Sequence, residues 1–283
     1  MIREEFQVLD HSVVIETDSD SVAALLAYLS QTSVQDIPVT SVIRYSVCRT
    51  TDGFAVAEDG RLLDVEFSAA SVLEQIHRRM HRRVFEAAAG RGWVRLHAGL
   101  ASWLDTRFLV VGSKGSGKTT LLSRLALGGA EVEGDEIVMI AGDLVAAFPR
   151  RLHVKEGTTD LVPGLAAALD DVPSVDSGTG GLVYAWDPGV SGFPWRTRFA
   201  AIDWVLLLEP NHGGQSRVIP RARHEIAPLV MREVLVDDPS DRSWLGPVCA
   251  VLAGAQSYEL RLGRLDQAVE QLMAILETDG EPT

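Results

Sequence analysis

A glycine-rich loop between an apolar strand and a helical segment constrains this chain more than any other feature. Residues 107–120 read RFLVVGSKGSGKTT, in which an apolar run leads into the pattern G-x-x-x-x-G-K-[ST]. The continuation, TLLSRLAL, has helical spacing. Glycines let successive backbone N–H groups turn toward one anion, and the first turn of a helix attracts the same negative charge. The segment therefore predicts a strand–loop–helix unit that binds the phosphates of a nucleotide.

The loop positions have different expected parts in nucleotide binding. Lys118 is expected to reach the terminal phosphates, and the Thr119 hydroxyl is expected to bind Mg²⁺. The 26 cationic residues include lysine only at positions 114, 118 and 155. We interpret Lys114 as accidental, whereas the neighbours of Lys118 and Lys155 indicate that a compact ammonium is needed there. ATP and Mg²⁺ are the predicted cofactors. The predicted nucleotide-binding residues are Gly112, Ser113, Lys114, Gly115, Ser116, Gly117, Lys118, Thr119 and Thr120.

Charge and cysteine content argue against several classes of protein. The formal net charge is −13 and hydrophobic residues make up 46% of the chain, which excludes wholesale disorder and disfavours general binding to nucleic acid or an anionic membrane. Cys48 and Cys249 lie far apart, so neither a disulfide framework nor a structural zinc site is expected. The N-terminus does not resemble a signal peptide, and no apolar run approaches membrane-spanning length. We expect a cytoplasmic protein with no nucleic-acid or membrane partner.

Two domains are expected, residues 1–90 and 91–283. The first has short strand and helix patterns and ends in SAASVLEQIHRRMHRRVFEAAAG (68–90), which predicts a long helix ended by glycine. No catalytic constellation occurs here, so we expect a mixed α/β region that serves packing or partner docking. Its HRRMHRR segment is interpreted as a solvated helix face, with anion docking or a subunit contact as the alternative.

Two acids in the second region suit phosphate chemistry, and a histidine stands on a strand near them. Asp135 and Glu136 stand at the start of an apolar strand soon after the loop helix, well placed to bind Mg²⁺ or to accept a hydroxyl proton. A turn acid beside a solvated glutamate is the alternative. His97 lies between apolar residues of a neighbouring strand, a pattern more typical of a core histidine than of a catalytic one.

Two later runs leave open what is done with the phosphate. FPRRLHVKEG (148–157) supplies Arg150, Arg151 and Lys155, cations suited to a transferring phosphoryl group. The apolar strand 201–209 ends in Glu209, which favours instead a P-loop ATPase or nucleotide-gated regulatory module with no hydroxyl acceptor. Nucleotide binding without catalysis, as a scaffold, is a third alternative.

The order and spacing of these runs resemble the HPr kinase/phosphorylase family, a branch of P-loop kinases akin to phosphoenolpyruvate carboxykinase. The resemblance extends from about Trp93 to the C-terminal helix and rests on LHAGLA (96–101), GSKGSGKTT (112–120), GDEIVMI (134–140) and FPRRLHVKEG (148–157). It implies an α/β fold, with a P-loop kinase domain of the HPr kinase/PEP carboxykinase type and a smaller N-terminal mixed α/β domain. It also allows a homo-oligomer.

The same resemblance implies roles for individual residues. It places His97 in the active site and makes Asp135 the base that accepts the hydroxyl proton. Thr119 and Glu136 are then the residues that share Mg²⁺, and Lys155 helps to stabilise the charge of the transferring group.

One departure from the family pattern bears on the substrate. The family signature of the type L-E-I-R-G-L-G reads LHVKEG here (152–157), so its glutamate is not in the expected place and its arginine is Lys155. The chain is more similar to the HPr-kinase-like enzymes found beside peptide-modification genes, including lasso-peptide kinases. We therefore expect transfer to a Ser or Thr hydroxyl on a peptide or small protein, with a lasso-type precursor peptide favoured over HPr.

Overall fold

The computed structural model describes every residue of the chain except 27, 30–32, 177–180, 239 and 280–283. The chain divides into two compact units. The first is Met1–Gln31 with Gln35–Arg91, and the second is Thr32–Val34 with Gly92–Thr283. The fold is mixed α/β with several sheets, which confirms the predicted α/β class at that level.

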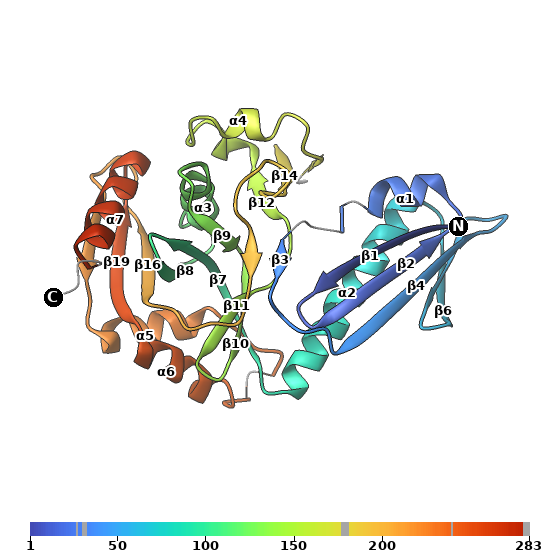
Figure 1. Ribbon diagram of the computed structural model, residues 1–283, viewed down its shortest axis with the longest axis horizontal. Helices are drawn as coiled ribbons and strands as arrows, with labels where there is room; N and C mark the ends of the chain where they lie inside the picture. Colours follow the sequence, from blue (N-terminus) through green and yellow to red (C-terminus); the bar gives the residue numbers. More distant parts are fainter. Residues whose placement is uncertain (27, 30–32, 177–180, 239, 280–283) are drawn as a thin grey trace. The chain divides into compact units, whose positions relative to one another are not determined.

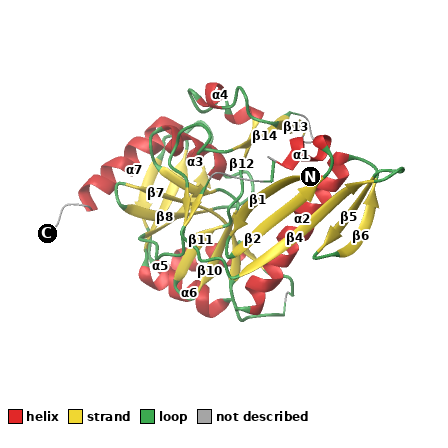
Figure 2. Cartoon of the chain, turned by 45° about the vertical axis from the view of Figure 1, so that its right-hand side comes forward, coloured by secondary structure: helices red, strands yellow, loops and turns green. Residues whose placement is uncertain are grey.

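The first unit is built on a five-stranded sheet in the order β1-β2-β4-β5-β6. β2 and β4 are parallel, and the other neighbouring pairs are antiparallel. α1 contacts β1 and β2, and α2 contacts β5 and β6, so both helices belong to this unit (Figure 2). The elements are β1 (Ile2–Val8), β2 (His11–Thr17), α1 (Asp20–Leu26), β4 (Ser41–Arg49), β5 (Phe54–Glu58), β6 (Arg61–Glu66) and α2 (Ala69–Gly90).

α2 begins where the sequence provides a cap. The Ser68 hydroxyl accepts a hydrogen bond from the Ser71 N–H at 3.1 Å, and the Ser68 N–H donates to the Ser71 hydroxyl at 3.3 Å. This reciprocal pairing satisfies donors that the first turn leaves open. Val72, Ile76 and Met80 are buried along one face of the helix, because residues four apart lie on the same side.

The central sheet of the second unit has nine strands. Seven of them run in the order β11-β10-β7-β8-β16-β19-β17, and β9 and β18 also pair with β7. β8, β16 and β19 are parallel, so their carboxyl ends share one edge of the sheet. The strands are β7 (Val94–Trp103), β8 (Thr106–Val111), β9 (Glu131–Gly134), β10 (Ile137–Ala141), β11 (Leu144–Ala147), β16 (Trp204–Pro210), β17 (Arg217–Pro220), β18 (Val234–Leu235) and β19 (Gln256–Leu262).

Helices cover both faces of this sheet, as the alternation of β8 requires. Phe108 and Val110 belong to an apolar cluster with α3 and α7, whereas Leu109 and Val111 belong to a second cluster with α5 and α6. In Figure 1, α5 and α6 lie together below β8 and β16, whereas α3 and α7 lie higher in the view. The helices are α3 (Lys118–Leu127), α4 (Leu165–Ala168), α5 (Arg223–Arg232), α6 (Leu245–Gly254) and α7 (Leu265–Asp279).

Two small sheets complete the described structure. Three short strands form the order β12-β14-β13, and β3 pairs with β15. Among the described residues, no helix is both long enough and apolar enough to cross a membrane. The remaining elements are β3 (Val34–Gln35), β12 (Leu152–Lys155), the 3₁₀ helix Glu156–Thr158, β13 (Ser174–Asp176), β14 (Leu182–Trp186) and β15 (Arg196–Thr197).

Candidate active site

The glycine-rich loop joins the carboxyl end of β8 to the start of α3. Gly115 and Gly117 have φ of 85° and 97°, a left-handed conformation that other residues adopt only with strain. Gly112 is needed for space, since a Cβ there would lie 2.7 Å from Ser116 Oγ and 2.9 Å from Leu208 O. The glycines therefore fix a tight loop at the edge where the parallel strands end.

Lys118, the first residue of α3, folds back over this loop. Its Nζ donates to Gly112 O at 2.5 Å and to Ser113 O at 3.2 Å, and the residue is buried. Burial lowers the pKa of Lys118, while the carboxylates of Glu233, Asp135 and Glu136 act in the opposite direction. The ammonium is thus held at the loop by carbonyl oxygens and surrounded by acids.

Thr119 and Asp135 are hydrogen-bonded to each other. The Thr119 hydroxyl donates to Asp135 Oδ2 at 3.0 Å, across the gap between α3 and the turn that joins β9 to β10. Asp135 is buried, and its second oxygen, Oδ1, has no hydrogen-bond partner. Burial raises the pKa of Asp135, and the nearby Arg150 guanidinium opposes that rise.

Glu136, the neighbour of Asp135, is directed elsewhere. Its Oε2 lies 2.5 Å from Arg150 Nη1, and its side chain is 45% exposed. The Arg150 side chain is only 16% exposed, and its Nη2 is buried without a hydrogen-bond partner. The structure therefore pairs Thr119 with Asp135 and Glu136 with Arg150, and the predicted sharing of Mg²⁺ by Thr119 and Glu136 stays a prediction.

His97 is held by a residue that the sequence analysis missed. His97 Nδ1 lies 2.8 Å from Glu233 Oε2, and the His97 N–H donates to Glu233 O, also at 2.8 Å. β7 carries His97 opposite Ile137 of β10, so it lies on the strand beside the acid-bearing turn. Glu233 follows α5 directly, 136 residues away in sequence, and no local pattern marks it.

Lys155 is separate from this cluster. β12 buries Leu152 and Val154 and exposes His153 and Lys155, as a half-buried strand does. Among the described residues the Lys155 side chain has no hydrogen bond or ion pair, and the cation that reaches the acids is Arg150. Of the other predicted loop residues, Ser113 and Lys114 are exposed and Thr120 is half-buried.

No protein-family model matches this sequence, and no curated protein matches it either. Among solved structures, the HPr(Ser) kinase/phosphatase from Coxiella burnetii is similar, with 12% sequence identity over 66% of this chain and 93% of that chain. The TM-score is 0.32. A likeness this weak carries no argument, so the site rests on the contacts described above.

The Thr119–Asp135 pair fits a magnesium ion that is held mainly by a nucleotide. In the described part of the chain, no group of three or more His, Cys, Asp or Glu side chains is arranged to hold a metal alone. Mg²⁺ usually takes one or two protein oxygens, phosphate oxygens and water. Thr119 Oγ1, which is half-buried, and the buried, unpartnered Asp135 Oδ1 are oxygens of that kind beside the glycine-rich loop.

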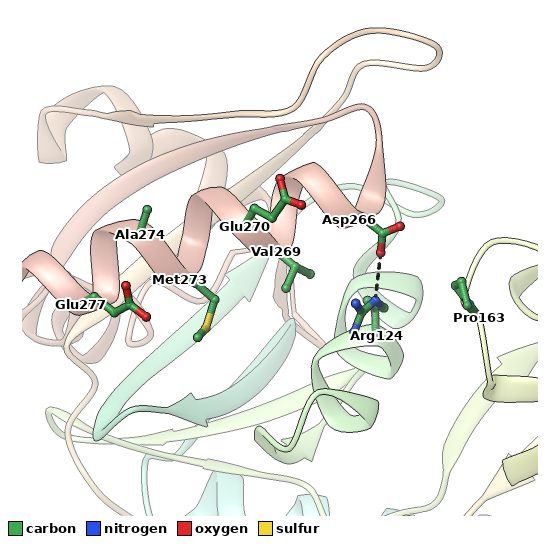
Figure 3. A pocket seen from close by; sticks show the side chains of 8 residues that line it. All are labelled: Arg124, Pro163, Asp266, Val269, Glu270, Met273, Ala274 and Glu277. Atoms are coloured by element: carbon green, nitrogen blue, oxygen red, sulfur yellow. Dashed lines mark hydrogen bonds and ion pairs between the residues drawn. The ribbon is translucent and has the colours of Figure 1, made fainter.

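A surface pocket between α3 and α7 lies apart from this cluster. It has a volume of about 620 Å³, and Figure 3 shows Arg124 of α3 reaching Asp266 of α7 within it. The two side chains form an ion pair at 3.2 Å. None of the predicted site residues lines the pocket, so it plays no part in the chemistry considered below.

Proposed function

We propose that this protein is an ATP-dependent, HPr-kinase-like kinase that transfers the γ-phosphoryl group to a Ser or Thr hydroxyl. The observation that carries the proposal is a group of three buried polar atoms without partners around the glycine-rich loop. They are Ser116 Oγ, Asp135 Oδ1 and Arg150 Nη2. An unpaired buried polar atom typically costs about 1–3 kcal/mol, so a ligand that pairs with Asp135 Oδ1 and Arg150 Nη2 would be stabilised beside Thr119.

The chemical kinds of these atoms favour magnesium and phosphate together. Asp135 Oδ1 can bind a cation or accept a hydrogen bond, whereas Arg150 Nη2 can only donate. Although Arg150 is close enough to affect the pKa of Asp135, these two atoms do not pair with each other. A magnesium-bound polyphosphate supplies a cation for the first atom and an acceptor oxygen for the second.

The residues would divide the work as follows. Lys118 and the loop N–H groups would bind phosphate oxygens, and Thr119 would hold Mg²⁺ beside the Asp135 carboxylate, with Glu136 as its predicted second ligand; the metal supplies charge neutralisation when bound. The acceptor oxygen bonds to the γ-phosphorus as the bond to the β-phosphate oxygen breaks, and ADP leaves. Asp135 would take the hydroxyl proton at Oδ1, the oxygen that has no partner among the described residues. His97 and Lys155 keep their predicted roles in catalysis.

The proposed acceptor is a hydroxyl on a peptide or small protein. The departure at 152–157 from the family signature supports a lasso-type precursor peptide over HPr.

We also propose that residues 91–283 carry the kinase and that residues 1–90 serve partner docking. A cytoplasmic location and a homo-oligomer remain part of the proposal.

Intact-mass analysis of candidate peptides, incubated with the protein, ATP and Mg²⁺, tests the proposal by looking for one added phosphate. Asp135→Asn should keep nucleotide binding and lose transfer by about 10²–10⁴-fold, the range expected for a missing proton acceptor. Asp143→Asn, an exposed acid in the turn after β10, is the matched control. Unchanged transfer in Asp135→Asn would refute the role given to Asp135.

An ATPase without a hydroxyl acceptor is the second candidate, and one observation favours it. β16 lies parallel to β8 with Leu207 opposite Val111, which brings Glu209 to the edge that carries the loop. Its side chain is exposed. Under this alternative, Glu209→Gln abolishes ATP hydrolysis measured without any peptide. Under the kinase proposal, peptide phosphorylation survives that substitution.

A further inference from the structure

Arg150 is the one cation of the run 148–157 that is seen to reach the acid pair in the described structure. It follows β11 by three residues, and the intervening Phe148 N–H donates to Ile137 O at 2.8 Å, which ties this segment to the start of β10. The guanidinium therefore lies beside Glu136 and close to Asp135. Arg151 points to Asp187, 4.0 Å away, and Lys155 is exposed.

The two ends of the Arg150 guanidinium differ. Nη1 is paired with Glu136, while Nη2 is buried and has nothing to donate to. A planar guanidinium presents its N–H groups as a fork, which suits two oxygens of one phosphate. The Glu136 carboxylate binds Nη1, one of the two ends of the guanidinium. Because that carboxylate is nearly half exposed, water can replace it, and an incoming phosphate can compete with it for Arg150.

Position along the nucleotide decides which phosphate Arg150 would meet. Lys118 lies over the loop itself, held by Gly112 O and Ser113 O. Arg150 is paired with Glu136, the residue after the Asp135 that accepts from Thr119, and it acts on the pKa of Asp135, so it lies beside the acids. In the proposed transfer the γ-phosphoryl group must lie beside Asp135, the residue that takes the hydroxyl proton. Arg150, which lies beside the same acids, would therefore meet the terminal phosphate.

We infer that Arg150 recognises the γ-phosphate, and that Glu136 holds Arg150 in place until a nucleoside triphosphate displaces it. The pair thereby makes the site select triphosphate over diphosphate. This inference rests on the proposed function, because it requires a nucleotide in the glycine-rich loop. Under this inference, Arg150 is the cation of the run 148–157 that binds phosphate. The Glu136 carboxylate competes with that phosphate for Arg150.

Calorimetric titration with a non-hydrolysable ATP analogue and with ADP, both with Mg²⁺, tests the inference without any acceptor. Arg150→Gln should weaken binding of the ATP analogue by about 10- to 100-fold, the range for a hydrogen bond to a charged group, and leave ADP binding within about twofold. Arg150→Lys keeps the charge without the fork and should fall between Arg150→Gln and the unsubstituted protein. If Arg150→Gln does not fold, Arg150→Lys takes its place in the titrations.

Glu136→Gln gives the opposite expectation. Removal of the competing carboxylate should strengthen binding of the ATP analogue several-fold and leave ADP unchanged. Arg217→Gln, an exposed arginine on the edge strand β17, controls for the general loss of positive charge. Equal weakening of the ATP analogue and ADP in Arg150→Gln, or weaker binding of the analogue in Glu136→Gln, would overturn the inference.

A Lys118→Ala variant separates this inference from the proposed function. If Lys118→Ala binds both nucleotides as well as the unsubstituted protein does, the proposed nucleotide site is wrong. If Lys118→Ala loses both nucleotides while Arg150→Gln keeps its preference for the ATP analogue, the site stands and only the role of Arg150 is refuted.

Discussion

Replacing Arg107 with methionine should strongly destabilise the second unit, because the buried Glu133 carboxylate keeps only Arg198, 3.8 Å away, and the carbonyls that Arg107 serves lose their donor. Arg107 Nε and Nη2 donate to the two carboxylate oxygens of Glu133, each at 2.7 Å, and the two side chains are 5% and 0% exposed. The guanidinium also donates to four backbone carbonyls, those of Val145, Arg198, Ala200 and Ala201. The pair anchors β9, which delivers Asp135 two residues later.

Breaking a buried ion pair on one side typically costs about 3–5 kcal/mol. For a unit of this size that corresponds to a fall in Tm of about 6–20 °C. All six tryptophans lie in the second unit, so urea unfolding followed by tryptophan fluorescence reports on this unit alone. A loss in unfolding free energy below about 1 kcal/mol would show that water or a neighbour repairs the charge, and would refute the reasoning.

The pH dependence supplies a second readout of the same change. Burial raises the pKa of Glu133, and the Arg107 guanidinium opposes that rise. Without Arg107 the carboxyl pKa rises further. A carboxyl whose folded pKa exceeds its unfolded value loses stability as the pH rises above the unfolded value, so the penalty should be smaller near pH 5 than near pH 8. The double variant Arg107→Met/Glu133→Leu, with no unpaired charge, should recover much of the loss.

Three further predictions concern the loop and the first unit. Gly117→Ala places a side chain at φ 97° and should destabilise the second unit by about 1–2 kcal/mol and abolish nucleotide binding in calorimetry. Ser68→Ala removes the cap of α2 and should cost the first unit about 1 kcal/mol in urea unfolding followed by far-UV circular dichroism. Burial acts to raise the pKa of Asp10, but hydrogen bonds from Arg91 and Thr40 lower it overall, so this stabilisation is present above the unfolded pKa and lost on acidification. Arg91→Gln should therefore narrow the stability difference between neutral and acidic solution, measured by the same circular dichroism.

Local signals explain what the sequence analysis could predict. The glycine-rich loop and the serine before α2 act within a few residues of themselves, so their structures follow from their own neighbourhoods. The continuous apolar run Phe108–Val111 likewise predicts that a strand enters the loop, and the sheet buries both faces of that strand.

Long-range pairing explains what could not be predicted. Glu233 reaches His97 only because β18 pairs with β7, a contact that sheet topology decides. Arg150 and Lys155 stand in one run of sequence, but β12 begins between them, and its alternation directs Lys155 to solvent. Asp135 and Glu136 lie in the turn between β9 and β10, where the chain changes direction, and Asp135 meets Thr119 whereas Glu136 meets Arg150.

The unpartnered atoms that support a nucleotide site should also lower the free energy of unfolding of the ligand-free protein. Asp135 keeps a buried charged oxygen unpaired. Asp135→Asn removes the charge and can still accept from Thr119, but its amide nitrogen takes the place of the unpaired oxygen, so the stability of the second unit should rise by only about 1 kcal/mol. The ATP analogue with Mg²⁺ should raise the Tm of the unsubstituted protein more than that of the variant, because only the former offers a carboxylate to the metal. Thermal unfolding followed by tryptophan fluorescence measures both effects. A variant less stable than the unsubstituted protein would mean that the Asp135 carboxylate is a structural group, and the unpaired oxygen would then say nothing about a ligand.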